Sequence, residues 1–245
     1  MTEQMKIAHR LEFEGISTEK LIRAMENPVR AYEDEMIDGV IIDIGCGQSS
    51  TLLDYLESGR QLIAVDNELS QLDYLKQRVQ NYKKGNLDDW VFQCTNFPED
   101  GIPEKDYALI ILSNILHFYP LKDCIKIGKL LADIAKPGTL IYSRVHSNKH
   151  FSNTPEDPNN NDYFKHYFSV EDMDSIFPHS MFERLYCAEV ENANSQTEMK
   201  IQMKWIEEVY RKLFQINNRR EIENAKKEHI STQKESGILT VYKRK

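Results

Sequence analysis

Several common signals are missing from this sequence of 245 residues. No apolar run approaches the roughly 20 residues that a bilayer-spanning helix needs. The first residues alternate charged and apolar side chains and contain no apolar signal-peptide core. The cysteines lie far apart and form no Cys-x-x-Cys pair, so the sequence indicates neither a disulfide framework nor a zinc or other metal site. We therefore expect a cytoplasmic protein with reduced thiols and no membrane association.

An excess of positive charge is also missing, because the formal net charge is −8. Lysines and arginines gather between Lys204 and Lys234, but glutamates are interspersed among them, which is typical of a solvated helix face. Broad electrostatic capture of nucleic acid is therefore unfavourable, and a nucleic-acid partner is not expected.

Short β-rich apolar runs alternate with helical patterns through the middle of the chain. This alternation predicts right-handed crossovers and a parallel sheet, and continuous apolar runs such as Val40–Ile44 are typical of strands covered on both faces. The predicted strands are Val40–Ile44, Gln61–Val65, Trp90–Gln93, Tyr107–Leu112, Thr139–Ser143, Arg184–Val190 and Gly237–Lys243. The predicted helices between and after them are Ser50–Ser58, Ser70–Tyr82, Leu121–Ala135, Val170–Phe177 and Met199–Phe214.

The predicted fold is a doubly wound α/β domain with a mostly parallel seven-stranded sheet, helices on both faces and an antiparallel C-terminal edge strand. Residues 1–38 are interpreted as an N-terminal helical cap that Pro28 interrupts. Residues 39–245 form the main domain, with a helical insertion around 195–235. The polar stretch Val145–Asp162 has the composition of an exposed loop.

The segment from Val40 to Ser50 predicts a nucleotide-binding turn. A strand runs into Gly45-Cys46-Gly47, where glycines allow a tight turn and close approach of a ligand, and then into a helix that opens with serines. The second strand ends at Asp66, which is placed to accept hydrogen bonds from a ribose diol. Asp43 disfavours a pyrophosphate ligand and favours one with an ammonium group. A dinucleotide fingerprint would also place glycine at Ser50.

Together these segments resemble class I S-adenosylmethionine-dependent methyltransferases, over roughly Val40 to Val190. The motifs that carry the resemblance are Asp43-Ile44-Gly45-Cys46-Gly47, Asp66, Asn96-Phe97, Asp106-Tyr107, Ser113-Asn114-Ile115-Leu116-His117 and Lys136-Pro137-Gly138. The resemblance implies S-adenosyl-L-methionine as cofactor and methyl transfer as the reaction. Ser49 departs from the family pattern, which usually has a third glycine at this position.

The resemblance also implies a set of cofactor-binding residues. The turn at Gly45 and Gly47 would pass under the methionine part of the cofactor, with Asp43 orienting its ammonium group. Asp66 would hold the ribose hydroxyls, and its neighbour Asn67 is included in the predicted site.

Two further pairs complete this predicted cofactor site. Asn96 and Phe97 would contact adenine, although an aspartate is common in the family where Asn96 stands. Ser113 and Asn114 would line the methionine side and the point of methyl transfer.

Methyl transfer to an acceptor that carries a proton calls for a proton acceptor, usually histidine. His117, four residues after Ser113, is the first candidate and His146, after the fifth strand, the second. The alternative for His117 is a capping or packing role, and the alternative for His146 is a solvent-exposed position in a polar loop. The predicted acceptor is an unidentified small molecule, and a homodimer is compatible with the sequence. Two other functions stay open: an NAD-dependent Rossmann oxidoreductase and a non-catalytic cofactor-binding scaffold.

Overall fold

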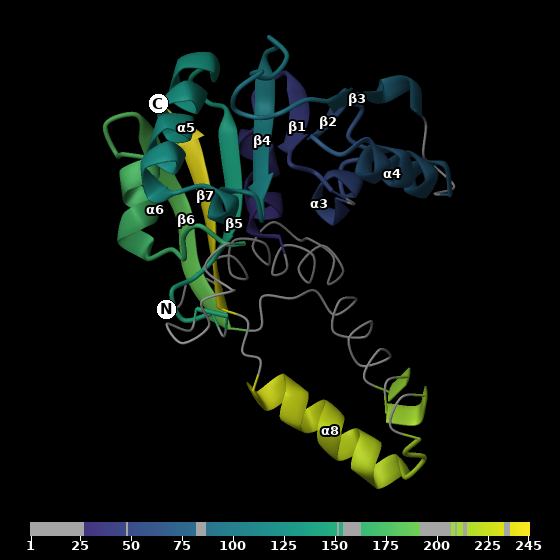
Figure 1. Ribbon diagram of the computed structural model, residues 1–245. Helices are drawn as coiled ribbons and strands as arrows, with labels where there is room; N and C mark the ends of the chain where they lie inside the picture. The colour runs from purple at the N-terminus through teal and green to yellow at the C-terminus, as the bar shows by residue number, and fades with distance from the viewer. Residues whose placement is uncertain are drawn as a thin grey trace.

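The computed structural model describes residues 27–47, 49–81, 87–150, 152–153, 163–191, 207–208, 210–212, 215–232 and 236–245. A seven-stranded sheet with the order β3-β2-β1-β4-β5-β7-β6 forms its centre (Figure 1). The strands are β1 (Val40–Ile44), β2 (Leu62–Asp66), β3 (Trp90–Cys94), β4 (Tyr107–Ser113), β5 (Leu140–His146), β6 (Phe182–Glu191) and β7 (Ser236–Arg244).

Strands β1 to β5 pair in parallel, whereas β7 runs antiparallel to both β5 and β6. The doubly wound α/β fold with an antiparallel edge is thus confirmed, and β6 is the outermost strand of that edge. Because β1 lies between β2 and β4, the strand order reverses beside it. Open parallel sheets bind ligands at the carboxyl ends of the strands at such a reversal.

Helices cover both faces of the sheet (Figure 1). The side chains of the strands divide accordingly into two apolar core clusters, one beneath each helical layer. One layer contains η1 (Pro28–Glu35), α3 (Ser50–Leu53) and α4 (Leu69–Asn81), and the other contains α5 (Leu121–Ile134) and α6 (Val170–Ile176). The remaining helices are η2 (Leu87–Asp89), η3 (Leu116–Phe118) and α8 (Arg219–Thr232).

Most predicted elements are confirmed, with shifts at their ends. The helix after β1 is shorter than predicted, because α3 ends at Leu53 and the chain continues in turns. A capping box precedes α6: Ser169 Oγ accepts a hydrogen bond from the Asp172 amide at 3.2 Å, and the Asp172 carboxylate accepts one from the Ser169 amide at 2.9 Å. These two bonds satisfy amides that would otherwise lack partners.

Parts of the predicted cap and insertion lie outside the described residues. Residues 1–26 of the cap are among them, and its described part, η1, is a 3-10 helix that begins at Pro28. Within 199–214, only residues 207–208 and 210–212 are described, and these are helical. The insertion also contains α8, which lies away from the sheet in Figure 1. In the described part of the chain, no helix is long and apolar enough to span a membrane.

Candidate active site

The turn after β1 has the conformation that its two glycines allow. Gly45 and Gly47 have φ values of +67° and +48°, a region that favours glycine. A Cβ added to Gly45 would lie 2.4 Å from Ile115 Cδ1, whereas a Cβ on Gly47 would meet no atom within 4 Å. Gly45 is therefore required by packing against the segment after β4, and Gly47 leaves open space over the turn.

Asp66 fixes the turn from the end of β2. Its Oδ2 accepts a hydrogen bond from the Gly47 amide at 2.8 Å, and its Oδ1 accepts one from the Glu68 amide at 2.9 Å. The side chain is mostly buried, and each carboxylate oxygen keeps a second lone pair. The structure thus brings Asp66 to the glycine turn, and its contact with a ribose stays a prediction.

Asp43 lies beneath the same turn and is only 2% exposed. Ser49 Oγ donates a hydrogen bond to Asp43 Oδ2 at 2.5 Å, but Asp43 Oδ1 is buried without a hydrogen-bond partner among the described residues. Burial raises the pKa of Asp43 to about 7, the Ser49 hydrogen bond opposes this rise, and the negative charge of Asp66 adds to it. Among the residues that the structure describes, Asp43 is therefore a buried carboxyl group without a cationic partner.

The two residues predicted to contact adenine, Asn96 and Phe97, differ in their exposure to solvent. Asn96 is exposed, and its backbone amide donates a hydrogen bond to Asp100 Oδ2 at 3.0 Å. Phe97 is buried in the core cluster on the α5 side, and its carbonyl accepts a hydrogen bond from Tyr119 Oη at 2.5 Å. Asn67, after β2, is exposed. Their contacts with adenine or ribose stay predictions.

Ser113 and Asn114 lie at the carboxyl end of β4, next to the glycine turn. Both are half-buried. Asn114 has a φ of +60°, which is uncommon outside glycine. Its backbone amide donates a hydrogen bond to the Arg144 carbonyl of β5 at 2.8 Å. The end of β4 is therefore tied to β5 at the position where the chain turns toward His117.

The two histidines predicted to be catalytic lie side by side. The rings of His117 and His146 stack with centroids 4.2 Å apart, and His150 stacks on the other side of His146 at 4.1 Å. We call these three residues the histidine stack. The Nδ1 atoms of His117 and His146 are buried and have no hydrogen-bond partner among the described residues.

All three imidazoles are neutral at neutral pH. Burial lowers the pKa of His117 to about 2, with further lowering from His146, His150 and Arg144. Burial likewise lowers the pKa of His146 to about 3 and that of His150 to about 4. A neutral imidazole has a free nitrogen lone pair, but with these pKa values it is a weak base at neutral pH, so a proton-acceptor role requires the pKa to rise when cofactor and acceptor bind.

Aromatic side chains enclose the stack. The ring of Phe164 meets both His117 and His146 edge-on, at 4.8 and 4.7 Å. Phe118 packs against His117, and Tyr167 lies beside His146 and His150. The carboxyl ends of β4 and β5 therefore carry a cluster of neutral imidazole and aromatic rings, with Arg144 close enough to act on His117 and His146.

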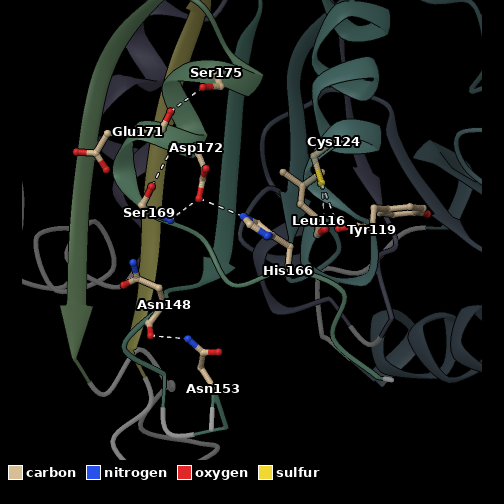
Figure 2. Close-up of polar contacts among 10 residues, drawn as sticks. All are labelled: Leu116, Tyr119, Cys124, Asn148, Asn153, His166, Ser169, Glu171, Asp172 and Ser175. Atoms are coloured by element: carbon tan, nitrogen blue, oxygen red, sulfur yellow. Dashed lines mark hydrogen bonds and ion pairs between the residues drawn. The ribbon is translucent and has the colours of Figure 1, made fainter. Parts of the chain in front are cut away.

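Backbone and thiol hydrogen bonds position this cluster. The Cys124 thiol of α5 donates to the Leu116 carbonyl at 3.3 Å, which anchors η3 (Figure 2). The Lys165 amide donates to the His117 carbonyl at 2.8 Å, and the Phe168 amide to the His146 carbonyl at 2.9 Å. The segment that carries Phe164 is thus fixed to both histidine-bearing strand ends.

His166 has a different role from the histidine stack. Its Nε2 lies 3.1 Å from Asp172 Oδ2, the carboxylate that also caps α6 (Figure 2). Sequence reasoning missed His150, although its spacing of four residues from His146 was a usable signal. It also missed that the Ser49 hydroxyl, which caps α3 by accepting from the Leu52 amide, donates a hydrogen bond to Asp43 as well.

The described residues contain no group of three or more His, Cys, Asp or Glu side chains that could hold a metal ion. Residues 41–138 match the family model of a methyltransferase domain. No curated protein sequence matches the chain.

Solved structures with this fold are numerous at low sequence identity. The cyclopropane synthase MmaA2 from Mycobacterium tuberculosis has a TM-score of 0.62 at 9% identity, over 92% of this chain and 85% of its own. Coclaurine N-methyltransferase bound to N-methylheliamine and S-adenosylhomocysteine has a TM-score of 0.60 at 13% identity, over 90% and 72%. The mycolic acid cyclopropane synthase CmaA1, complexed with S-adenosylhomocysteine and CTAB, has a TM-score of 0.60 at 11% identity, over 96% and 87%.

Residues 41–138 therefore match a methyltransferase domain, and the chain shares the fold of these solved structures. The residues at the first turn fit S-adenosylmethionine, because the unpartnered Oδ1 of Asp43 suits an ammonium group and Gly47 leaves room above the turn. Asp66 would hold the ribose. The methyltransferase domain also favours S-adenosylmethionine over the nicotinamide cofactor that the sequence had left open.

Proposed function

We propose that this methyltransferase acts on a small-molecule acceptor at the carboxyl ends of β4 and β5, against the histidine stack. The observation that carries the proposal is the pairing of His117 and His146, whose buried Nδ1 atoms lack hydrogen-bond partners among the described residues. These histidines follow the two strands on the side of β1 opposite β2, where the acceptor would meet the cofactor's methyl group.

The surroundings of the stack favour an acceptor of modest size that binds by its apolar or aromatic part. Phe118, Phe164 and Tyr167 supply ring surface, and the imidazoles carry no charge at neutral pH. The net charge of −8 disfavours a nucleic-acid acceptor. The similar coclaurine N-methyltransferase holds N-methylheliamine, which is itself a small molecule.

The bound cofactor supplies an electrophilic methyl group, and the side chains of this protein orient the acceptor. An acceptor with a hydroxyl, amine or thiol group loses a proton as its new bond to carbon forms. His146 is the middle ring of the stack and is half-buried, whereas His117 is only 2% exposed. His146 is therefore our first candidate for the proton acceptor, and His117 packs against its ring.

Methyl-labelled S-adenosylmethionine offers a direct test. The enzyme would be incubated with pooled small molecules that carry hydroxyl, amine or thiol groups, and separately with protein and nucleic-acid fractions. We expect label in the small-molecule pool. Label confined to a macromolecular fraction would contradict the proposal, and so would a lack of turnover on every pool despite tight cofactor binding, which favours a scaffold.

Variants of the stack test the roles of its histidines once an acceptor is in hand. His146→Gln should lower kcat between about 100- and 10,000-fold, the usual contribution of general acid–base catalysis. His117→Gln should lower it less. Affinity for S-adenosylhomocysteine should stay unchanged in both variants. His166→Gln is the matched control, because this imidazole bonds to Asp172 outside the stack. Full activity of His146→Gln would reduce that residue to a packing role.

A further inference from the structure

Ser49 makes two hydrogen bonds at the first turn, and together they fix the direction of its hydroxyl. Its Oγ accepts from the Leu52 amide at 2.9 Å, so it caps α3. Its single hydroxyl hydrogen is directed to Asp43 Oδ2, 2.5 Å away. The families that this sequence resembles usually have glycine at this position, and a glycine would leave that carboxylate oxygen without the hydroxyl.

The hydrogen bond from Ser49 to Asp43 determines which oxygen of Asp43 is available to a ligand. With Oδ2 held by Ser49, Oδ1 is the buried atom without a hydrogen-bond partner among the described residues. The titratable groups that act electrostatically on Asp43 from the neighbouring elements are Asp66 of β2, Cys46 of the turn and Tyr142 of β5. Their ionised forms are all anionic, so none of them stabilises a carboxylate at this position.

We infer that Ser49 is a positioning residue that holds Asp43 Oδ1 toward the ammonium group of the bound cofactor, and that cofactor binding releases a proton from Asp43 to the solvent. In the free protein a buried carboxyl without a cation is favoured in its protonated form. The arriving ammonium group stabilises the carboxylate, so the O–H bond of Asp43 breaks and the buffer takes up the proton.

The direction of the pH effect follows from this exchange. Because the pKa of free Asp43 is about 7 and binding lowers it, affinity rises as the pH approaches 7 from below. The α-amino group of the cofactor itself loses its charge near pH 8. Measurements between pH 6 and pH 7 therefore isolate the contribution of Asp43.

Isothermal titration with S-adenosylhomocysteine, in buffers that differ in ionisation enthalpy, counts the protons released. For a pKa of about 7 we expect roughly 0.9 proton per site at pH 6 and about half a proton at pH 7, with affinity rising about fivefold between them. Asp43→Asn cannot release this proton and should remove both effects. Proton release that persists in Asp43→Asn, or that is absent from the unaltered protein, would overturn the inference.

Ser49→Ala and Ser49→Thr separate positioning from helix capping. Alanine removes a hydrogen bond that lowers the pKa of Asp43, so proton release at pH 7 should rise from about one half toward one, and affinity at pH 7 should fall. Threonine keeps the hydroxyl and should behave like the unaltered protein. Loss of thermal stability in Ser49→Ala with an unchanged proton count would show that Ser49 only caps α3.

Infrared difference spectroscopy provides a second measurement that needs no Ser49 variant. Addition of S-adenosylhomocysteine at pH 6 should remove a protonated-carboxyl band in the unaltered protein, and Asp43→Asn should lack this change. An unchanged carboxyl band on binding would contradict the inference. If S-adenosylhomocysteine did not bind at all, the cofactor assignment would fail instead, so the two failures are distinguishable.

Discussion

The two halves of the sheet's carboxyl edge differ in their chemistry. At β1 and β2, Asp43 and Asp66 surround a glycine turn, and Asp66 accepts hydrogen bonds from backbone amides. At β4 and β5, His117 and His146 stack among aromatic rings and their Nδ1 atoms lack partners among the described residues. The first half is suited to a cationic ligand with hydroxyl groups, whereas the second is suited to an uncharged one.

Burial acts on both halves but with opposite effects on proton binding. It raises the pKa of Asp43 to about 7 and lowers the pKa of His117 to about 2, because in each case it disfavours the charged form. Both groups are therefore largely neutral just below pH 7. If the proton release inferred above occurs, cofactor binding would change the charge at the first half and leave the second half neutral.

The largest expected effect is on the turn itself. Gly45→Ala forces a side chain into the left-handed region and places its Cβ against Ile115, so it should destabilise the protein by about 2–5 kcal/mol and weaken S-adenosylhomocysteine binding. Urea denaturation and calorimetry would measure both. Gly47→Ala is the control: it shares the positive φ but meets open space, so its cost in stability should be about 1–2 kcal/mol. Equal costs would show that contact with Ile115 is unimportant.

The next largest effect is expected on cofactor affinity when Asp66, at the end of β2, is replaced. Asp66→Ala should weaken S-adenosylhomocysteine binding by at least about 1.5–3 kcal/mol, the usual contribution of hydrogen bonds to a charged group. Calorimetry measures this change, and Asp133→Ala, which removes an exposed carboxylate on α5, is the control. Unchanged affinity would show that Asp66 only orders the turn through the Gly47 amide.

The smallest expected effect is the pH dependence of folding at the histidine stack. The pKa of His117 is lower in the folded protein than in the unfolded chain, where it is about 6.5. The unfolded chain therefore binds more protons, and stability is full above pH 6.5 and is lost as the pH falls below it. His117→Gln should remove about 2 kcal/mol of the loss between pH 7 and pH 5.

Urea denaturation at several pH values measures this loss of stability. His179→Gln, at an exposed histidine outside the stack, is the control substitution. Asp43→Asn should act in the opposite sense, because the raised pKa of Asp43 costs stability as the pH rises toward 7. An identical pH profile for His117→Gln and the unaltered protein would contradict a buried neutral stack.

The fold was largely predictable because its signals are local. Apolar runs such as Val40–Ile44 specify buried parallel strands, and the glycines after β1 specify a turn that few other residues can adopt. The short α3 was less predictable, because neither glycine nor proline marks its end at Leu53. In that case the amphipathic pattern extended further than the helix.

The candidate site was predictable only in part, because its chemistry depends on contacts between distant segments. Sequence identifies Asp43 and His117 as candidates, but it does not show that Ser49 takes one oxygen of Asp43 or that Ile115 closes over Gly45. Nor does it reveal the stacking of His146 on His117 and His150, on which the neutral state of these imidazoles partly depends.

The position of β7 between β5 and β6 has a consequence for synthesis on the ribosome. Since β6 pairs only with β7 in the sheet, β6 has no strand to join until residues 236–244 have emerged. Until then β5 also exposes one unpaired edge beside the histidine-bearing strand ends, and unpaired edges promote aggregation. The part of the sheet formed by β5, β7 and β6 can thus be completed only after β1, β2 and β3 have been synthesised.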